Sequence, residues 1–281
     1  MKPSGICPAH WQNLLVCTDG SAEARHAVSE TLALAGACGG KVHILKVLEI
    51  VPEFEAVVPD LRAQLEAGVR EEFQAFQAEA AGLGVAAKTL VRQSQLVHAA
   101  IVTEAEKLGA DVIVMGRSGR SGLARLWLGS VTARVIGFSP INVLVIPPGT
   151  SLGFARLLVA SDGSPDSAGA FQEALSLARS SGKVQLLALA AAREEGEIIE
   201  AQAIIDGLLA AANREGLPLT GISPQGQQPD DAIVQTALSK EVDLIIMGSH
   251  GRTGLRRLLM GSVTERVIGQ APCPVLVVKR K

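Results

Sequence analysis

Two glycine patterns of identical spacing are the features of this sequence best suited to chemistry. The first is Gly116-x2-Gly119-x9-Gly129-Ser130, and the second is Gly248-x2-Gly251-x9-Gly261-Ser262. Glycine permits positive φ and has no Cβ to obstruct a ligand, so successive backbone N–H groups can point at one anion. Each Gly-Ser pair opens a predicted helix, whose free N–H groups and positive dipole end favour phosphate. The spacing therefore predicts two anion-binding arcs in each pattern, one on either side of a nine-residue spacer.

The alternative is purely structural: the glycines only make turns, and Ser130 and Ser262 only cap helices. Repetition of the same spacing after two apolar strands favours binding, although shared ancestry also preserves a motif. Asp19 and Asp162 have two interpretations of equal weight, since each ends a predicted strand and is followed by Gly-Ser. Either carboxylate can accept hydrogen bonds from a ribose or an adenine amino group, or it closes an Asx-turn.

The nine-residue spacers carry arginines at equivalent positions. Arg120 matches Arg252, and Arg125 matches Arg257. These guanidinium groups can meet terminal phosphates, although solvated surface arginines are the commoner outcome. His250 lies between two glycines of the second pattern. We expect it to be exposed rather than catalytic.

The two patterns differ in the helix that follows. Ser262-Val-Thr-Glu265 fits a capping box, in which the acid occupies an N-cap N–H, whereas Ser130-Val-Thr-Ala133 lacks the acid. On electrostatics we therefore expect two sites of unequal affinity, the first being the tighter.

Several enzyme signatures do not occur. The sequence has no G-x4-G-K-[S/T] phosphate loop, no G-x-S-x-G nucleophile elbow and no metal-ligand spacing. We expect no catalytic residue and at most weak ATP hydrolysis. Mg or Mn is expected only on the phosphates of a bound nucleotide.

The patterns recur because the chain is an internal repeat. Asp19 and Asp162 are 143 positions apart, whereas Gly116 and Gly248 are 132 apart, so the first copy is longer by 11 residues in its middle. Those residues can form a lid. Pro147–Gly153 marks the boundary, with a flexible glycine turn, and predicts domains at 11–148 and 154–281.

Apolar runs and helical stretches alternate along each copy. We expect strands at 14–17, 42–48, 86–91, 112–115 and 142–146, and at 157–160, 184–190, 217–222, 244–247 and 275–278. We expect helices at 22–37, at 59–81, before the fourth strand and from 130, and at 165–180, 197–213, before the ninth strand and from 262. This α/β alternation predicts parallel sheets with helices on both faces. Such sheets bind ligands beyond the carboxyl ends of their strands.

Composition narrows the class of protein. The chain has 281 residues, 48% of them hydrophobic and 19% charged, and a net charge of −2. We expect no nucleic-acid partner, because such proteins are usually basic. There is no apolar run near 18 residues and no leader-like start, so we expect no membrane partner and a cytoplasmic location. Cys17 lies in an apolar strand and is expected to be a core residue.

Together these residues resemble the universal stress protein family in its tandem two-domain form. The glycine signature is present in both copies, and Met247–Gly254 and Ala271–Val278 also look like the family. Phe138–Asn142 replaces the latter stretch in the first copy. The resemblance implies two Rossmann-like, adenine nucleotide hydrolase-like domains. Each would have a five-stranded parallel sheet of order 3-2-1-4-5, and the chain would fall in the ATP-binding branch of the family.

The resemblance also implies a ligand, which is ATP or else ADP or AMP. The strand-one Asp and a strand-two apolar residue would hold the nucleoside, and the glycines the phosphates. The implied residues are Thr18, Asp19, Val47, Met115, Gly116, Gly119, Arg120, Gly129, Ser130 and Val131 in the first copy, and Ser161, Asp162, Leu189, Met247, Gly248, Gly251, Arg252, Gly261, Ser262 and Val263 in the second.

The family's habit of pairing last strands implies that the two copies pair with each other, with a homodimer also possible. The implied function is a stress-response or regulatory protein that signals through nucleotide-dependent conformation. A slow ATPase or phosphotransferase and a nucleotide-free dimeric scaffold are the alternatives.

Overall fold

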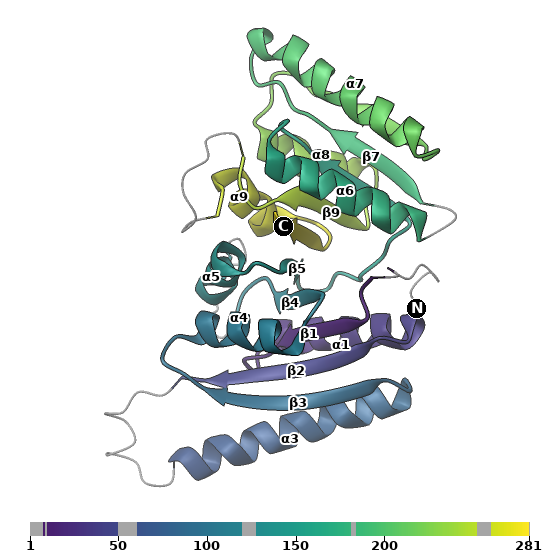
Figure 1. The fold of residues 1–281 in the computed structure, drawn as a ribbon. Helices are drawn as coiled ribbons and strands as arrows, with labels where there is room; N and C mark the ends of the chain where they lie inside the picture. Colours follow the sequence, from purple (N-terminus) through teal and green to yellow (C-terminus); the bar gives the residue numbers. More distant parts are fainter. Residues whose placement is uncertain are drawn as a thin grey trace.

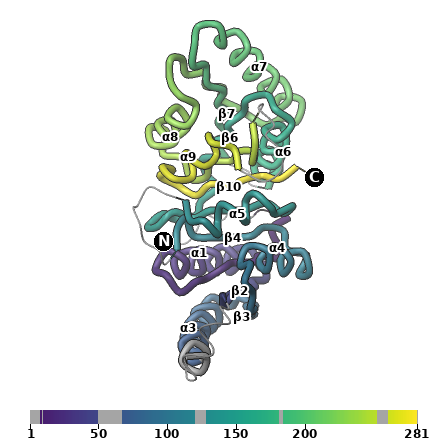
Figure 2. The backbone as a smooth tube through the Cα atoms, turned by 90° about the vertical axis from the view of Figure 1, so that its left-hand side faces the viewer, coloured from purple at the N-terminus to yellow at the C-terminus, as the bar shows by residue number. Residues whose placement is uncertain are grey.

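The two halves of the chain share one sheet. The computed structural model describes residues 8, 10–49, 61–119, 128–180, 184–251 and 260–280. Within these residues, ten strands lie in the order β3-β2-β1-β4-β5-β10-β9-β6-β7-β8 (Figure 1). The helices α3 and α7 lie at opposite ends of the elongated molecule (Figures 1 and 2).

Each half repeats the same succession of elements. The first half contains β1 (Asn13–Cys17), α1 (Ala22–Cys38), β2 (Lys41–Leu48), α3 (Leu61–Gly82), β3 (Ala86–Gln93), α4 (Val97–Leu108), β4 (Val112–Gly116), α5 (Ser130–Phe138) and β5 (Asn142–Ile146). The second half contains β6 (Arg156–Ala160), α6 (Pro165–Arg179), β7 (Gln185–Leu189), the 3-10 turn η1 (Glu195–Glu197), α7 (Ile198–Arg214), β8 (Leu219–Ile222), α8 (Pro229–Ser239), β9 (Leu244–Gly248), α9 (Ser262–Gln270) and β10 (Val275–Val278).

Within each half the strands are parallel and follow the predicted order 3-2-1-4-5. The structure differs from two separate sheets at one place. β5 and β10 pair antiparallel, with Leu276 opposite Leu144, and join the halves into a single sheet. The expected pairing of the last strands therefore takes place within the chain.

Two apolar cores, one on each face of the sheet, run across both halves. Helices α1, α3, α6 and α7 cover one core, and α4, α5, α8 and α9 cover the other. At the junction, successive residues alternate between the cores, because strand side chains point to opposite faces. Leu144 and Leu276 enter the first core, and Val145 and Val275 the second. Helices on both faces are confirmed.

The first helix of each half begins where the sequence predicts. Ser21 caps α1 and accepts a hydrogen bond from the Ala24 N–H at 3.1 Å. Ser164 caps α6, and Pro165 follows at the first helical position, where the missing N–H has no cost. Both helices thus start directly after the ends of β1 and β6.

The connection between the halves is anchored, contrary to the flexible turn expected from its glycines. Leu152 and Phe154 are buried in the first core. The Leu152 N–H donates to Glu30 Oε2 at 2.8 Å. Trp11 packs edge-on against Phe154, and its Nε1 donates to Glu173 of α6. Apolar side chains in the connection therefore override its glycine content.

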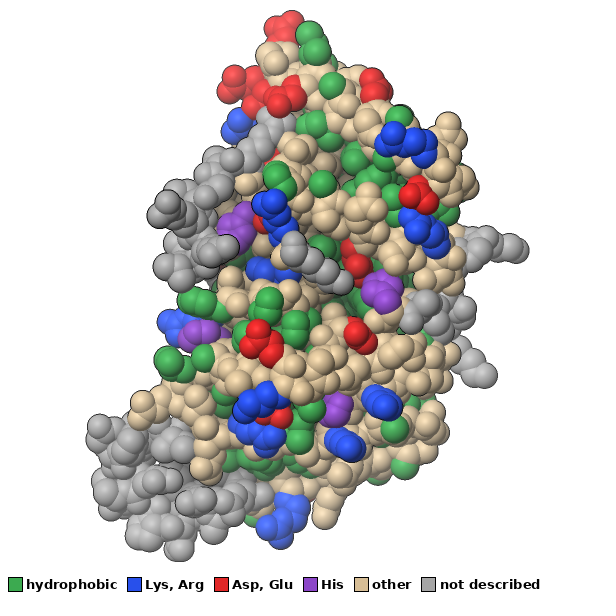
Figure 3. Space-filling model, viewed as in Figure 1, with side chains coloured by type: hydrophobic (Ala, Val, Ile, Leu, Met, Phe, Trp, Pro, Cys, Tyr) green, Lys and Arg blue, Asp and Glu red, His purple; other side chains and the backbone are tan. Residues whose placement is uncertain are grey.

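Cys17 is a buried core residue, as expected, and burial raises the pKa of its thiol to about 12. Acidic and basic side chains are interspersed on the face drawn in Figure 3. In the part of the chain that the structure describes, no helix combines the length and apolar character needed to cross a bilayer.

Candidate functional site

A cavity of about 380 Å³ lies at the carboxyl ends of β6, β7 and β9. It brings together every residue predicted for the second site except Arg252, which lies outside the described residues. The predicted residues that line it are Ser161, Asp162, Leu189, Met247, Gly248, Gly251, Gly261, Ser262 and Val263. Its volume is within the range usual for small-molecule sites.

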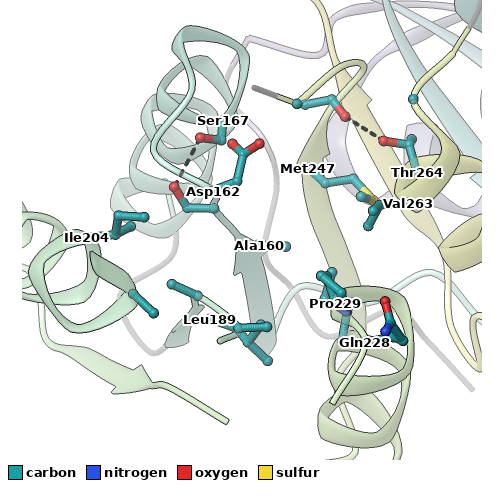
Figure 4. Close-up of a pocket in the computed structure, with 18 of the residues that line it drawn as sticks. Ala160, Asp162, Ser167, Leu189, Ile204, Gln228, Pro229, Met247, Val263 and Thr264 are labelled. Atoms are coloured by element: carbon teal, nitrogen blue, oxygen red, sulfur yellow. Dashed lines mark hydrogen bonds between the residues drawn. The ribbon is translucent and has the colours of Figure 1, made fainter. Parts of the chain in front are cut away.

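One end of the cavity is apolar. Ala160 and Leu189 come from the strand ends, Ile204 from α7 and Pro229 from the start of α8 (Figure 4). Met247 and Val263 lie across the cavity from Ile204 (Figure 4). The arrangement suits a flat apolar ring.

The other end is built from the glycine loop. The Gly261 N–H donates to the Ser249 carbonyl at 3.0 Å, which closes the spacer at its base. Thr264 Oγ1 donates to the Gly248 carbonyl at 3.0 Å and ties the first turn of α9 to β9. Helix α9 begins at Ser262, and its first N–H groups have no intrahelical partner. The two predicted arcs therefore lie side by side and can face one anion.

Gly248 and Gly251 are required for close packing, and positive φ is not the reason. A Cβ at Gly248 would lie 2.8 Å from the backbone of Asp166, where α6 begins. A Cβ at Gly251 would lie 2.6 Å from Asp162 Oδ2. Positive φ is used in the strand-one turn instead, at Gly163, where φ is 78°. Gly248 is the last residue of β9 rather than part of a turn, and it also lines the cavity.

Both strand-one aspartates close an Asx-turn. Asp162 Oδ1 accepts from the Ser164 N–H at 3.0 Å, and Asp19 Oδ1 accepts from the Ser21 N–H at 2.9 Å. The Asx-turn is confirmed, and in the second copy the same carboxylate also lines the cavity. The two interpretations of these residues do not exclude each other.

His250 is not the exposed residue expected from the sequence. Its side chain is 20% exposed and lines the cavity. Its Nδ1 lies 3.1 Å from Ser249 Oγ and 3.6 Å from Asp166 Oδ2. The ring is therefore held beside the glycine loop by a hydroxyl and a carboxylate.

The capping-box prediction for Glu265 is wrong. Gly261 is the N-cap, with φ −61° and ψ 140°, so Ser262 is already the first helical residue. The Glu265 N–H donates to the Gly261 carbonyl as an ordinary helical bond. Extended backbone at Gly261 shifts the helix start by one position, and the acid no longer has capping-box spacing.

The part of the cavity wall formed by α7, the segment before it and α8 was not predicted from the sequence. Arg193, Glu197 and Gln228 line the cavity, although nothing in their spacing marks them. Glu197 accepts from the Arg193 backbone N–H at 2.8 Å and pairs with its guanidinium, which lowers the pKa of this carboxyl to about 2. Their placement depends on how α7 packs over β7 and β8.

The glycine loop of the first copy is held by the same two hydrogen bonds as that of the second. The Gly129 N–H donates to the Arg117 carbonyl at 2.9 Å, and Thr132 Oγ1 donates to the Gly116 carbonyl at 3.1 Å. A Cβ at Gly119 would collide with Asp19 Oδ2. The predicted residues Thr18, Asp19, Met115, Gly116, Gly119, Gly129, Ser130 and Val131 lie at these strand ends and in this loop. Arg120, with Arg125 and Arg257, lies outside the described residues.

The strand registers correct one correspondence between the copies. The Thr18 N–H donates to the Leu45 carbonyl, and the Ser161 N–H donates to the Leu189 carbonyl, both at 2.9 Å. Leu45 is therefore the counterpart of Leu189. Val47 lies two residues further along β2 and corresponds to Ala191, which also lines the cavity. Sequence offset alone missed this because the loop between the first two strands differs in length.

The first copy places a different set of charged side chains at its strand ends. Glu72 of α3 accepts a hydrogen bond from Thr18 Oγ1 at 2.8 Å and forms an ion pair with Lys46 of β2. The side chains of Lys46 and Glu72 are only 12% and 11% exposed. Glu23 of α1 accepts from the backbone N–H of Ser118 at 3.0 Å, inside the glycine loop.

The extra residues of the first copy fall between β2 and α3. Counterparts are 144 positions apart in β2 (Ile44 and Ala188) and 132 apart in the following helix (Ala80 and Ala212). Most of that segment, 50–60, lies outside the described residues. The lid expected from the sequence falls on the same residues. Among the described residues, no three His, Cys, Asp or Glu side chains gather as a metal site would require.

Comparison with known proteins gives a consistent result over nearly the whole chain. The family model described as the universal stress protein family matches residues 10–147 and 153–279. A universal stress protein of Mycolicibacterium smegmatis is 30% identical over 209 residues, which cover 70% of each protein. One from Synechocystis is 26% identical, over 94% of this chain and 99% of that protein.

Matches over shorter stretches have higher sequence identity. A universal stress protein of Methanocaldococcus jannaschii is 60% identical over 52 residues, which is 18% of this chain and 31% of that protein. This chain thus matches about a third of that relative's length. The crystal structure of a universal stress protein from Archaeoglobus fulgidus has the same fold, with a TM-score of 0.74 at 21% identity, over 96% of this chain and 99% of that one.

Proposed function

The chain belongs to the universal stress protein family, and we propose that it binds an adenine nucleotide and acts in a stress response. The nucleotide is ATP, ADP or AMP. Binding changes the conformation of the glycine loop and of α9, and a partner reads that change. Any Mg or Mn is carried by the nucleotide phosphates.

The observation that carries the proposal is the two-ended cavity of the second copy. Its apolar end, with Leu189, Ile204 and Met247, is suited to a base. Its other end, with Gly251 and the start of α9 at Ser262, is suited to phosphate. A nucleotide has these two chemistries joined by a sugar.

The residues between the two ends suit the ribose. Asp162 lies in the cavity wall between Ser161 and the loop at Gly251. Its carboxylate can accept hydrogen bonds from ribose hydroxyls while it keeps its Asx-turn, because a carboxylate has about four acceptor positions. Each part of the nucleotide thus has a matching part of the wall.

A slow phosphotransferase or ATPase is the second candidate. The observation in its favour is the Ser249–His250–Asp166 cluster beside the glycine loop. We propose that signalling dominates, and that turnover stays below about 1 s⁻¹, the low end of typical enzymes. Release of phosphate from ATP above that rate, lost in His250→Ala, would favour the enzyme.

Isothermal titration calorimetry of the full chain tests the binding proposal. ATP, AMP and adenosine are titrated with Mg²⁺ present, and UTP is the control ligand. We expect saturable heat with the adenine nucleotides and much weaker heat with UTP. No heat with any adenine nucleotide would overturn the proposal.

A further inference from the structure

We infer that only the second copy takes a nucleotide, because side chains of the first copy occupy its own site. The inference rests on the proposed function and adds which of the two glycine loops is used, and which residues decide it. The deciding residues are Glu23, Lys46 and Glu72, with Thr18 as an uncharged partner.

The internal repeat allows the two sites to be matched residue by residue. The strand registers pair Lys46 with Ala190, one position after Leu45 and Leu189. Helices α3 and α7 end alike: the Val85 N–H bonds to the Ala80 carbonyl, and the Leu217 N–H bonds to the Ala212 carbonyl. These pairs are 132 positions apart, which makes Ile204 the counterpart of Glu72.

All three counterparts line the second copy's cavity. They are Ser161 for Thr18, Ala190 for Lys46 and Ile204 for Glu72. The cavity's base end therefore has a methyl group and a branched alkyl chain where the first copy has an ammonium and a carboxylate. The equivalent space in the first copy is crossed by the Thr18–Glu72–Lys46 chain of hydrogen bonds.

This chain of hydrogen bonds opposes the binding of a base for an energetic reason. Lys46 and Glu72 are both nearly buried and satisfy each other. A base entering between them would separate the pair and leave two poorly solvated charges, which is strongly unfavourable. Lys46 Nζ would also lie 3.0 Å from a Cβ at Gly20, so the ammonium packs against the strand-one turn that would approach the sugar.

The phosphate end of the first copy is occupied independently. Glu23 Oε2 accepts from both the backbone N–H and the hydroxyl of Ser118, between the two glycines of the loop. A carboxylate thus takes an N–H that a phosphate needs, and a phosphate would also meet its negative charge. The counterpart Asp166 is one methylene shorter, and its hydroxyl contact is with Ser249 at 3.4 Å.

The expected order of affinities is therefore the reverse of the one that the sequence suggests. The sequence places the unfavourable acid at Glu265 in the second copy. The structure removes Glu265 from the N-cap and places Glu23 in the first copy's loop.

The test is the stoichiometry of ATP binding to the full chain, measured by calorimetry at protein concentrations well above Kd. We expect one equivalent for the wild type. Gly251→Ala drives a Cβ into Asp162, and we expect no saturable equivalent of ATP at the same concentrations. Gly207→Ala is the control, because a Cβ there meets nothing within 4 Å.

A graft tests the deciding residues directly. Glu23→Asp, Lys46→Ala and Glu72→Ile together give the first copy the second copy's side chains. We expect a second equivalent of ATP, and the same graft on Gly251→Ala should restore one equivalent. A folded graft that stays at one equivalent would overturn the assignment of these residues.

Two further outcomes test the inference without the graft. Two equivalents in the wild type, or one equivalent remaining in Gly251→Ala, would overturn the inference even if the graft does not fold. Absence of binding in the wild type would instead overturn the proposed function.

Discussion

Single side chains at this site serve the fold and the cavity together. Asp162 closes the turn into α6 with one oxygen and lies against Gly251 with the other. Asp166 lies in the first turn of α6 and packs against Gly248, and its Oδ2 lies 3.6 Å from His250 Nδ1. A change at any of these residues will therefore alter both local structure and binding, and tests must compare ligands as well as variants.

His250 is the residue at which such a comparison is sharpest. Its ring lines the cavity between Gly248 and Gly251, where a ring nitrogen can donate to a phosphate oxygen. We expect His250→Ala to weaken ATP about fivefold to twentyfold, in line with about 1–2 kcal/mol for such a bond. Adenosine, which has no phosphate, is the matched control and should bind the variant as it binds the wild type. An equal loss for both ligands would contradict a phosphate contact.

At the scale of elements, one threonine in each copy holds a helix to a strand end. Thr264 Oγ1 donates to the Gly248 carbonyl, and Thr132 Oγ1 donates to the Gly116 carbonyl. Both threonines are buried. We expect Thr264→Val to lower the free energy of unfolding by about 1–3 kcal/mol, because the isosteric valine leaves a buried carbonyl without its donor. Urea denaturation measures the loss.

Thr132→Val is the matched variant in the other copy. It should destabilise the chain to a similar extent, whereas only Thr264→Val should also weaken ATP binding. Equal effects on binding from the two variants would contradict the view that phosphate binds at the start of α9 and not at the start of α5.

Strand β3 is joined to α4 by a carboxylate that gives a pH-dependent contribution. Glu104 is buried and accepts two hydrogen bonds from Arg92, both at 2.7 Å, which lowers its pKa below the ordinary 4.5. Because the folded pKa is lowered, this contribution to stability is present above about pH 4.5 and is lost as pH falls through the folded pKa.

We therefore expect Glu104→Gln to be less stable than the wild type at pH 7, and the difference to shrink below about pH 4.5. Urea denaturation at several pH values between 7 and 3 checks this. A difference that does not depend on pH would mean that Glu104 acts through packing rather than charge.

At the scale of the whole molecule, the junction makes the two halves a single structure. Beyond the β5–β10 pairing, Arg117 donates to the Gly269 carbonyl of α9 at 3.1 Å, and Lys279 Nζ donates to the Ile136 carbonyl of α5 at 2.6 Å. The Arg117 contact connects the first copy's loop to the helix that faces the second copy's cavity. Both apolar cores are continuous across the junction.

Such continuity predicts one cooperative unfolding transition. We expect a single calorimetric peak, and both Thr132→Val and Thr264→Val should lower the temperature of that same peak. Two peaks, each shifted only by the variant in its own half, would show that the halves unfold independently.

The sequence by itself determined much of this protein. The alternation of apolar runs and helices, with Ser21 and Ser164 as caps, was sufficient for the α/β class, for the positions of the elements and for the repeat. The spacing of Gly248, Gly251 and Gly261 located the loop that lines the cavity. These features are local, since periodicity, caps and turn residues act over a few positions.

Only the tertiary structure decided which copy has an open site. Lys46, Glu72 and Glu23 lie on three different elements of the first copy, and no spacing relates them. Whether such side chains meet depends on the packing of α1 and α3 against β1 and β2. The sequence supplies a charged pair in one copy and Ala190 with Ile204 in the other, but that each pair meets at the site is a consequence of packing, because a contact between distant residues exists only once the chain is folded.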